Sequence, residues 1–294
     1  MNCPLQPTKL VKLKHIPNIF SSDNNFYVKV ENTNPSGSVK DIAVYSMLKG
    51  YQEKGLLKEG TKIIEATSGN TGISLAFFAS YFHYEAIIVM PSSMSKERRE
   101  MIKSYGATLV LVDGGMKQAE DLAIQMVKDT PNSILLDQFN NVDNIKGHYE
   151  ITGPEILSDL PDIDVFVAGF GTGGTVSGTG QYLKEYKKDV KVIAVEPFES
   201  PLLTKGEFGK HLIQGIGANF IPNNLNQNVV DEFVDVKGLR SIEMAKLIRN
   251  MEGLDVGYSS GAAVLGAIEY ANKHDLHGKN IVIILPDKGD RYSW

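Results

Sequence analysis

Short runs of β-branched and other apolar residues alternate along this chain with longer amphipathic stretches. The apolar runs predict strands at residues 26–30, 62–65, 86–90, 108–112, 165–168, 191–195 and 280–285. The amphipathic stretches predict helices at residues 95–105, 117–128, 180–187, 241–251 and 262–273. Strands that alternate with helices are typical of a parallel sheet covered by helices on both faces. We therefore expect an α/β fold built on mostly parallel sheets.

Size and composition narrow the class of protein. The 294 residues are enough for one large domain or two ordinary ones, and the 42% hydrophobic and 22% charged residues are typical of a globular protein. The formal net charge of -5 disfavours nucleic acid as a partner, because a nucleic-acid-binding face is basic. We see neither a long apolar run nor a signal-peptide pattern, so we expect a cytoplasmic protein without a membrane span.

The cysteine and histidine content indicates neither disulfides nor a metal. Cys3 is the single cysteine, which excludes an intrachain disulfide and suits a reducing compartment. The six histidines are scattered, and only His274 and His277 lie close together, in a polar stretch. We therefore expect no metal site.

The loop after the expected strand at 165–168 is rich in glycine and threonine. It contains Gly171, Thr172, Gly173, Gly174 and Thr175. Glycines let backbone N–H groups converge, threonine hydroxyls add donors, and the N-terminus of a following helix attracts negative charge. The loop therefore predicts a phosphate site. A tight turn that packs a helix against the sheet explains the loop equally well when it is taken alone.

Two further loops carry polar groups that suit a small ligand. Thr67, Ser68, Gly69, Asn70 and Thr71 follow the expected strand at 62–65. So many donors in a row favour carboxylate binding over a helix cap, for which one residue suffices. In the loop at 137–141, Gln138 offers an amide, although this segment alone indicates only a loop.

Ser259 and Lys40 complete the set of candidates. Ser259 lies in a Gly/Ser-rich segment where its hydroxyl can meet a ring nitrogen, although a helix cap explains this segment as well. Lys40 follows a turn-forming Pro/Gly/Ser cluster and begins a helix-like segment. A lysine held there out of water loses its proton more easily and becomes a nucleophile for an aldehyde. A solvated surface lysine is the alternative.

Taken together, these groups match one cofactor and its substrate. Pyridoxal 5'-phosphate carries an aldehyde for Lys40, a phosphate for the glycine-rich loop and a ring nitrogen for Ser259. Its amino-acid substrate adds a carboxylate for the polar loop. A nucleotide-binding module that uses only the phosphate site is a remote alternative, and it leaves Lys40 and Ser259 without a role.

Over nearly its whole length the chain resembles the cysteine synthase (O-acetylserine sulfhydrylase) and cystathionine β-synthase family of fold-type II pyridoxal-phosphate enzymes. The matching segments are residues 34–41, 67–72, 94–99, 138–139, 148–149, 152–155, 171–175, 199–201, 214–217, 259–263 and 291–292. The resemblance implies a two-domain α/β fold like that of the tryptophan synthase β chain. Residues 1–39 and 146–294 would form a larger domain that anchors the cofactor, and residues 40–145 a smaller, mobile domain that binds the substrate.

The resemblance also implies a role for each candidate residue. Lys40 would hold the cofactor covalently and later move the Cα proton of the substrate. Residues 171–175 would bind the phosphate, Ser259 the pyridine nitrogen and Asn70 the phenolic oxygen. The substrate carboxylate would be bound by Thr67, Ser68, Gly69, Asn70, Thr71 and Gln138.

The implied reaction is β-replacement, in which the substrate loses its β-substituent and a small nucleophile adds to the resulting aminoacrylate. A serine, unlike an aspartate, does not stabilise a protonated ring nitrogen, and this favours β-elimination over transamination. Cysteine synthesis is the leading interpretation, with hydrogen sulfide release from cysteine and cystathionine synthesis as alternatives. Family members are usually homodimers, and the C-terminal tail of a serine acetyltransferase is a candidate partner.

Five positions depart from the pattern of the family. The family usually has arginine where this chain has Ile42, and glycine where it has Ser36 and Asn219. It usually has isoleucine in place of Tyr258 and an apolar residue in place of Asp255. Each departure alone is consistent with neutral drift. Together they leave the natural β-substituent and nucleophile open. We expect Asn219 and Asp255 to add polarity where the nucleophile approaches the β-carbon.

Overall fold

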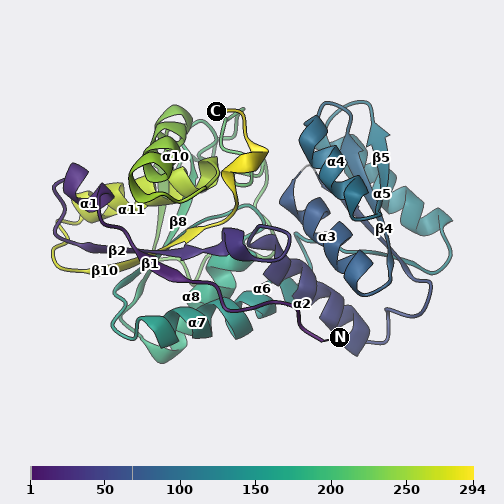
Figure 1. Cartoon of the computed structure of the whole chain (residues 1–294), viewed down its shortest axis with the longest axis horizontal. Helices are drawn as coiled ribbons and strands as arrows, with labels where there is room; N and C mark the ends of the chain where they lie inside the picture. Colours follow the sequence, from purple (N-terminus) through teal and green to yellow (C-terminus); the bar gives the residue numbers. More distant parts are fainter. Residues whose placement is uncertain (1, 68) are drawn as a thin grey trace.

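The computed structural model describes residues 2–67 and 69–294, which form two sheets with helices packed on each (Figure 1). In the six-stranded sheet the strands follow the order β1-β2-β10-β7-β8-β9. β1 runs antiparallel to β2, and every other pair of neighbours is parallel. The strands are β1 (Leu10–Lys12), β2 (Asn25–Val30), β7 (Val165–Gly169), β8 (Lys191–Pro197), β9 (Glu232–Val236) and β10 (Asn280–Leu285).

Successive residues of the central strands enter different cores on the two faces of this sheet. In β7, Val165 and Val167 belong to one core, whereas Phe166 and Ala168 belong to the other. This alternation follows from the two-residue period of a strand, and both faces are apolar because helices cover both. The covering helices are α10 (Gly238–Glu252) and α11 (Tyr258–Lys273) on one face, and α7 (Gly153–Asp159) and α8 (Gly174–Tyr186) on the other.

The four-stranded sheet is parallel throughout and occupies the other half of the molecule (Figure 1). Its strands follow the order β5-β4-β3-β6 and are β3 (Lys62–Ala66), β4 (Glu85–Pro91), β5 (Thr108–Val112) and β6 (Ser133–Leu135). In β3, Ile63 and Ile64 enter different cores. One core includes α2 (Lys40–Glu53), α3 (Asn70–Tyr81) and α4 (Lys96–Ser104), and the other includes α5 (Met116–Asp129).

Short helical segments connect these elements. They are α1 (Ile16–Ile19), α6 (Asp143–Gly147), α9 (Leu202–Lys205), the 3-10 turns Glu31–Thr33 and Gly289–Arg291, and the π-helical segment His148–Thr152. α6 packs against α2 and α8, and so joins the two halves. Among the helices in residues 2–67 and 69–294, none is long and apolar enough to cross a membrane.

The structure confirms the α/β class and the seven expected strands, which correspond to β2, β3, β4, β5, β7, β8 and β10. The sequence did not reveal β1, β6 and β9, whose side chains are mostly half-buried, because short edge strands carry a weak pattern. α8 begins at Gly174, before the expected start at residue 180, because its glycines obscure the helical pattern. All strands of the four-stranded sheet lie within residues 62–135. The domain boundaries given above stay a prediction.

We expect Ile283→Ala to lower the free energy of unfolding by about 2–5 kcal/mol, the usual cost of such a cavity in a core. Ile283 is fully buried in β10, between β2 and β7. Leu239→Ala is the control, because Leu239 is 66% exposed and its loss should cost less than about 0.5 kcal/mol. Urea unfolding followed by circular dichroism measures the free energy of unfolding of both variants. Equal losses in the two variants would contradict the assignment of β10 to the core.

Candidate active site

Lys40 is the first residue of α2, and the turn before it is attached to the end of β10. The backbone N–H of Val39 donates to the Pro286 carbonyl at 2.8 Å. Ser38 forms an antiparallel bridge with Asp287. Lys40 is thereby held where the six-stranded sheet ends and the helices of the four-stranded sheet begin.

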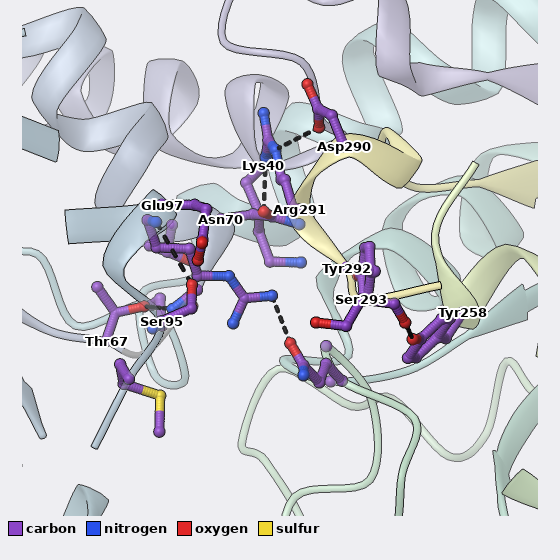
Figure 2. Close-up of a pocket in the computed structure, with 18 of the residues that line it drawn as sticks. Lys40, Thr67, Asn70, Ser95, Glu97, Tyr258, Asp290, Arg291, Tyr292 and Ser293 are labelled. Atoms are coloured by element: carbon purple, nitrogen blue, oxygen red, sulfur yellow. Dashed lines mark hydrogen bonds and ion pairs between the residues drawn. The ribbon is translucent and has the colours of Figure 1, made fainter. Parts of the chain in front are cut away.

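Two adjoining cavities meet at Lys40. The smaller, of about 30 Å³, is lined by Lys40, Asn70, Gly171, Thr172, Gly173, Thr175 and Ser259 among others. The larger, of about 830 Å³, is lined by Thr67, Gly69, Asn70, Thr71 and Gln138 among others. Figure 2 shows Lys40, Asn70 and Arg291 converging in the larger cavity. The structure thus brings the expected cofactor and substrate residues together, except that Gly174 lines neither cavity and Ser68 lies outside the described residues.

The glycine-rich loop between β7 and α8 is packed too closely for side chains at its glycines. Gly173 has a φ of +85°, and a Cβ there would lie 2.7 Å from the backbone of Leu225. A Cβ at Gly171 would lie 2.3 Å from the carbonyl oxygen of Gly215. The loop leads into the N-terminus of α8, where unpaired backbone N–H groups and the helix dipole favour an anion. This end of the small cavity therefore suits a phosphate group.

A buried histidine supports the end of this loop. His148 Nε2 lies 3.2 Å from the Thr175 hydroxyl, and His148 Nδ1 lies 2.8 Å from the Thr152 hydroxyl. Burial, assisted by the nearby charge of Lys40, lowers the pKa of His148 to about 3. The imidazole is therefore neutral and positions Thr175 without adding a charge.

The polar loop after β3 is linked to the loop that carries Gln138. The backbone N–H of Gly69 donates to the Thr67 hydroxyl at 3.2 Å, and the Thr71 hydroxyl donates to Gln138 Oε1 at 2.6 Å. Glu65, buried at the end of β3, accepts the backbone N–H of the residue before Gln138 at 2.9 Å. Burial raises the pKa of Glu65 to about 8. These contacts gather the donors at the carboxyl edge of the four-stranded sheet.

Ser259 lines the small cavity. It is the second residue of α11 and is 3% exposed. It shares the small cavity with Lys40 and with the glycine-rich loop. The structure therefore places Ser259 beside other residues expected to hold the cofactor, and its contact with a ring nitrogen stays a prediction.

Sequence reasoning gave no role to several residues that line these cavities. Asp287 is 1% exposed at the end of β10, and Arg291, Tyr292 and Arg98 line the larger cavity. Burial lowers the pKa of the Lys40 amine, and the Asp287 carboxylate acts in the opposite direction. Ligands bind beyond the carboxyl ends of parallel strands, and this rule applied to residues 280–285 would have pointed to Asp287.

The departures from the family pattern lie in different surroundings. Tyr258 lines the larger cavity, and Asn219 lines a neighbouring cavity of about 510 Å³ together with Gln138. Asp255 lines none of these cavities and pairs with Arg249 at 3.2 Å. The expectation that Asp255 adds polarity near the β-carbon is therefore wrong, because its side chain turns to a cation outside the site.

We expect His148 to stay neutral well below pH 6.5, the ordinary pKa of histidine, because its own pKa is about 3. Acidification from pH 6.5 towards pH 3 should then destabilise the fold, since the unfolded chain takes up a proton here that the folded chain does not. NMR titration of labelled histidines measures the pKa of His148. His277 is the control, because its hydrogen bond to Asp23 raises its pKa. Protonation of His148 near pH 6.5 would contradict the assignment.

Comparison with known sequences agrees with this geometry. The family described as "Pyridoxal-phosphate dependent enzyme" matches residues 4–287. The cysteine synthase B of Campylobacter jejuni is 48% identical over 271 residues, which cover 91% of this chain and 90% of that protein. A cysteine synthase of Staphylococcus aureus is 42% identical over 289 residues, which cover 97% of this chain and 92% of that protein.

Solved structures share the whole fold. A hydrogen sulfide-producing enzyme from Fusobacterium nucleatum matches with a TM-score of 0.93 at 40% identity, over 97% of this chain and 95% of that one. The cysteine synthase of Entamoeba histolytica matches with a TM-score of 0.93 at 40% identity, over 98% of this chain and 87% of that one. These matches confirm the fold-type II architecture. This chain belongs to the family of pyridoxal-phosphate-dependent enzymes and is a relative of the cysteine synthases.

Proposed function

We propose that the protein is a cysteine synthase that replaces the β-substituent of O-acetylserine with sulfide. The observation that carries this proposal is that Lys40 lines two adjoining cavities, one shared with the glycine-rich loop and the other with the polar loop after β3. A phosphate loop alone would serve a nucleotide equally well. An amine between the two loops suits a cofactor that carries an aldehyde and a substrate that carries a carboxylate. The names of the relatives support this choice of reaction.

The residues that line the two adjoining cavities fit pyridoxal phosphate. The glycine-rich loop at the N-terminus of α8 would hold the phosphate, Ser259 the ring nitrogen and Asn70 the phenolic oxygen. Lys40 would attach to the aldehyde carbon, and burial favours the neutral, nucleophilic form of its amine. When bound, the cofactor supplies an electron sink for negative charge at the substrate Cα.

The protein itself supplies orientation and proton transfer. Thr67, Thr71 and Gln138 would bind the substrate carboxylate beside Lys40. The Lys40 amine, once the substrate amine has taken its place, would accept the Cα proton and later return it. Closure of the half that carries the four-stranded sheet would keep water away from the reacting carbon.

A second activity, hydrogen sulfide release from cysteine, is favoured by one comparison. The Fusobacterium nucleatum enzyme whose fold matches this chain with a TM-score of 0.93 is described as hydrogen sulfide-producing. The same cavities would serve both reactions, because the two substrates differ only in the β-substituent. Incubation with O-acetylserine plus sulfide, and separately with cysteine alone, followed by measurement of cysteine and sulfide, determines which activity is larger.

We further propose that the enzyme is a cytoplasmic homodimer, as the family resemblance implies, and that a serine acetyltransferase tail is a candidate partner. The mass in solution tests the dimer, since one chain has a mass of 32.3 kDa. Light scattering that gives the single-chain mass at micromolar concentration would contradict it.

Lys40→Ala should remove the absorbance that arises when the cofactor is attached to Lys40 and lower kcat by about 10²–10⁴-fold or more, because it removes both the covalent anchor and the proton carrier. Absorbance spectra and cysteine formation measure the two effects. Lys49→Ala is a matched control on the same helix, because the Lys49 side chain is 44% exposed. A wild-type protein that shows no such absorbance with pyridoxal phosphate would favour the nucleotide-binding alternative.

Gly171→Ala should weaken cofactor binding by about tenfold or more, since the new methyl group must displace the Gly215 carbonyl, and overpacking of this kind costs about 1–3 kcal/mol. Titration of the cofactor-free enzyme with pyridoxal phosphate measures the affinity. Gly115→Ala is the control, because its Cβ would make an ordinary contact at 3.6 Å with Gln118. Unchanged affinity in Gly171→Ala would place the phosphate elsewhere.

A further inference from the structure

Asn70 links the four-stranded half of the molecule to the end of β10. It begins α3, and residues that follow β10 hold its side chain from both sides. Its Nδ2 group donates to Asp287 Oδ2 at 2.7 Å, and its Oδ1 accepts from Arg291 Nη1 at 2.5 Å. Figure 2 shows Asn70 and Arg291 next to each other in the larger cavity.

These two contacts determine which way the carboxamide faces. Rotation by half a turn would place its N–H groups against the Arg291 guanidinium and its oxygen against the Asp287 carboxylate, so donors would meet donors and acceptors would meet acceptors. Both partners are themselves held in place. Asp287 also accepts from the Tyr292 hydroxyl at 2.6 Å, and Arg291 also donates to the Ser36 carbonyl. The amide therefore has a single favourable orientation.

In this orientation Asn70 keeps one N–H for a ligand. A carboxamide carries two N–H donors. Within residues 2–67 and 69–294, Asp287 is the only acceptor that the Asn70 amide contacts. Asn70 lines both the small and the larger cavity. A ligand oxygen that bears negative charge is the natural partner for the remaining donor, because hydrogen bonds to ionised acceptors are the stronger ones.

We propose that Asp287 is a positioning residue that acts through Asn70, fixing the carboxamide so that it donates to an anionic oxygen of the cofactor or of the amino-acid substrate. This inference deepens the proposed function and rests on it in one respect, namely that Asn70 meets an amino acid or its cofactor. It also gives a role to a carboxylate that is 1% exposed, since burying such a group is costly without compensating contacts.

Asp287 has a competing role that the test must separate. Its charge acts on the Lys40 amine and opposes the effect of burial on the pKa of that amine. Asp287→Asn removes the charge but keeps an oxygen that accepts from Asn70. Asp287→Leu removes both the charge and the acceptor at similar volume. A positioning role therefore predicts different effects of the two substitutions, and a charge effect on Lys40 predicts equal effects.

The experiment measures binding of L-alanine to the cofactor-loaded enzyme from the change in visible absorbance. L-alanine has no leaving group on its β-carbon, so the signal reports binding without turnover. We expect Asp287→Leu to raise Kd by about tenfold or more, as for loss of a hydrogen bond in a charged, buried setting, and Asp287→Asn to raise it much less. Asn70→Ala should raise Kd to a similar extent. The double variant Asp287→Leu/Asn70→Ala should bind no more weakly than Asn70→Ala alone.

Equal losses of L-alanine affinity in Asp287→Asn and Asp287→Leu, or additive losses in the double variant, would overturn the proposal. Asp287 would then act through the effect of its charge on the Lys40 amine. Circular dichroism and cofactor content show which variants are folded. If Asp287→Leu does not fold, Asp287→Ser replaces it, because a serine is too short to reach Asn70. Failure of the proposed function has a different signature, in which the wild-type enzyme binds L-alanine but forms no cysteine from O-acetylserine and sulfide.

Discussion

The site depends on the attachment of the turn before Lys40 to the end of β10. The Val39 N–H and the Pro286 carbonyl join at 2.8 Å, and Ser38 pairs with Asp287. β10 lies between β2 and β7, and its apolar side chains are fully or almost fully buried, so the turn is attached to a buried, central strand of the six-stranded sheet. The helix that begins at Lys40 nevertheless packs in the other half. Lys40 therefore lies where the two halves of the molecule meet, and it lines both cavities there.

Burial gives the ionisable groups around these cavities their chemical character. Water stabilises charge, so a buried group favours its neutral form. Burial lowers the pKa of Lys40, lowers that of His148 to about 3 and raises that of Glu65 to about 8. A lysine whose pKa is lowered by burial suits attachment to an aldehyde. A neutral His148 contacts Thr175 of the glycine-rich loop without adding a charge there.

The elements that could be predicted from the sequence are those with a strong local pattern. Residues 165–168 and 281–285 are continuous apolar runs because β7 and β10 are covered on both faces. β1 and β6 have three residues each, too few to establish a period. α3 is buried on nearly all sides and therefore shows no polar face by which a helix is recognised. The polar loop before α3 was identified from its unusual residue content alone.

By itself the sequence determined the local chemistry of the site: a loop rich in glycine and threonine after a strand, a lysine after a turn, and a serine at the start of a helix. Residue type and near neighbours along the chain suffice for that. Only the tertiary structure decided that Asn70 lies between Asp287 and Arg291, and that Asp255 turns to Arg249 outside the cavities. Asn70 and Asp287 are 217 positions apart, and their contact depends on how the two halves of the molecule are placed, which no local pattern encodes.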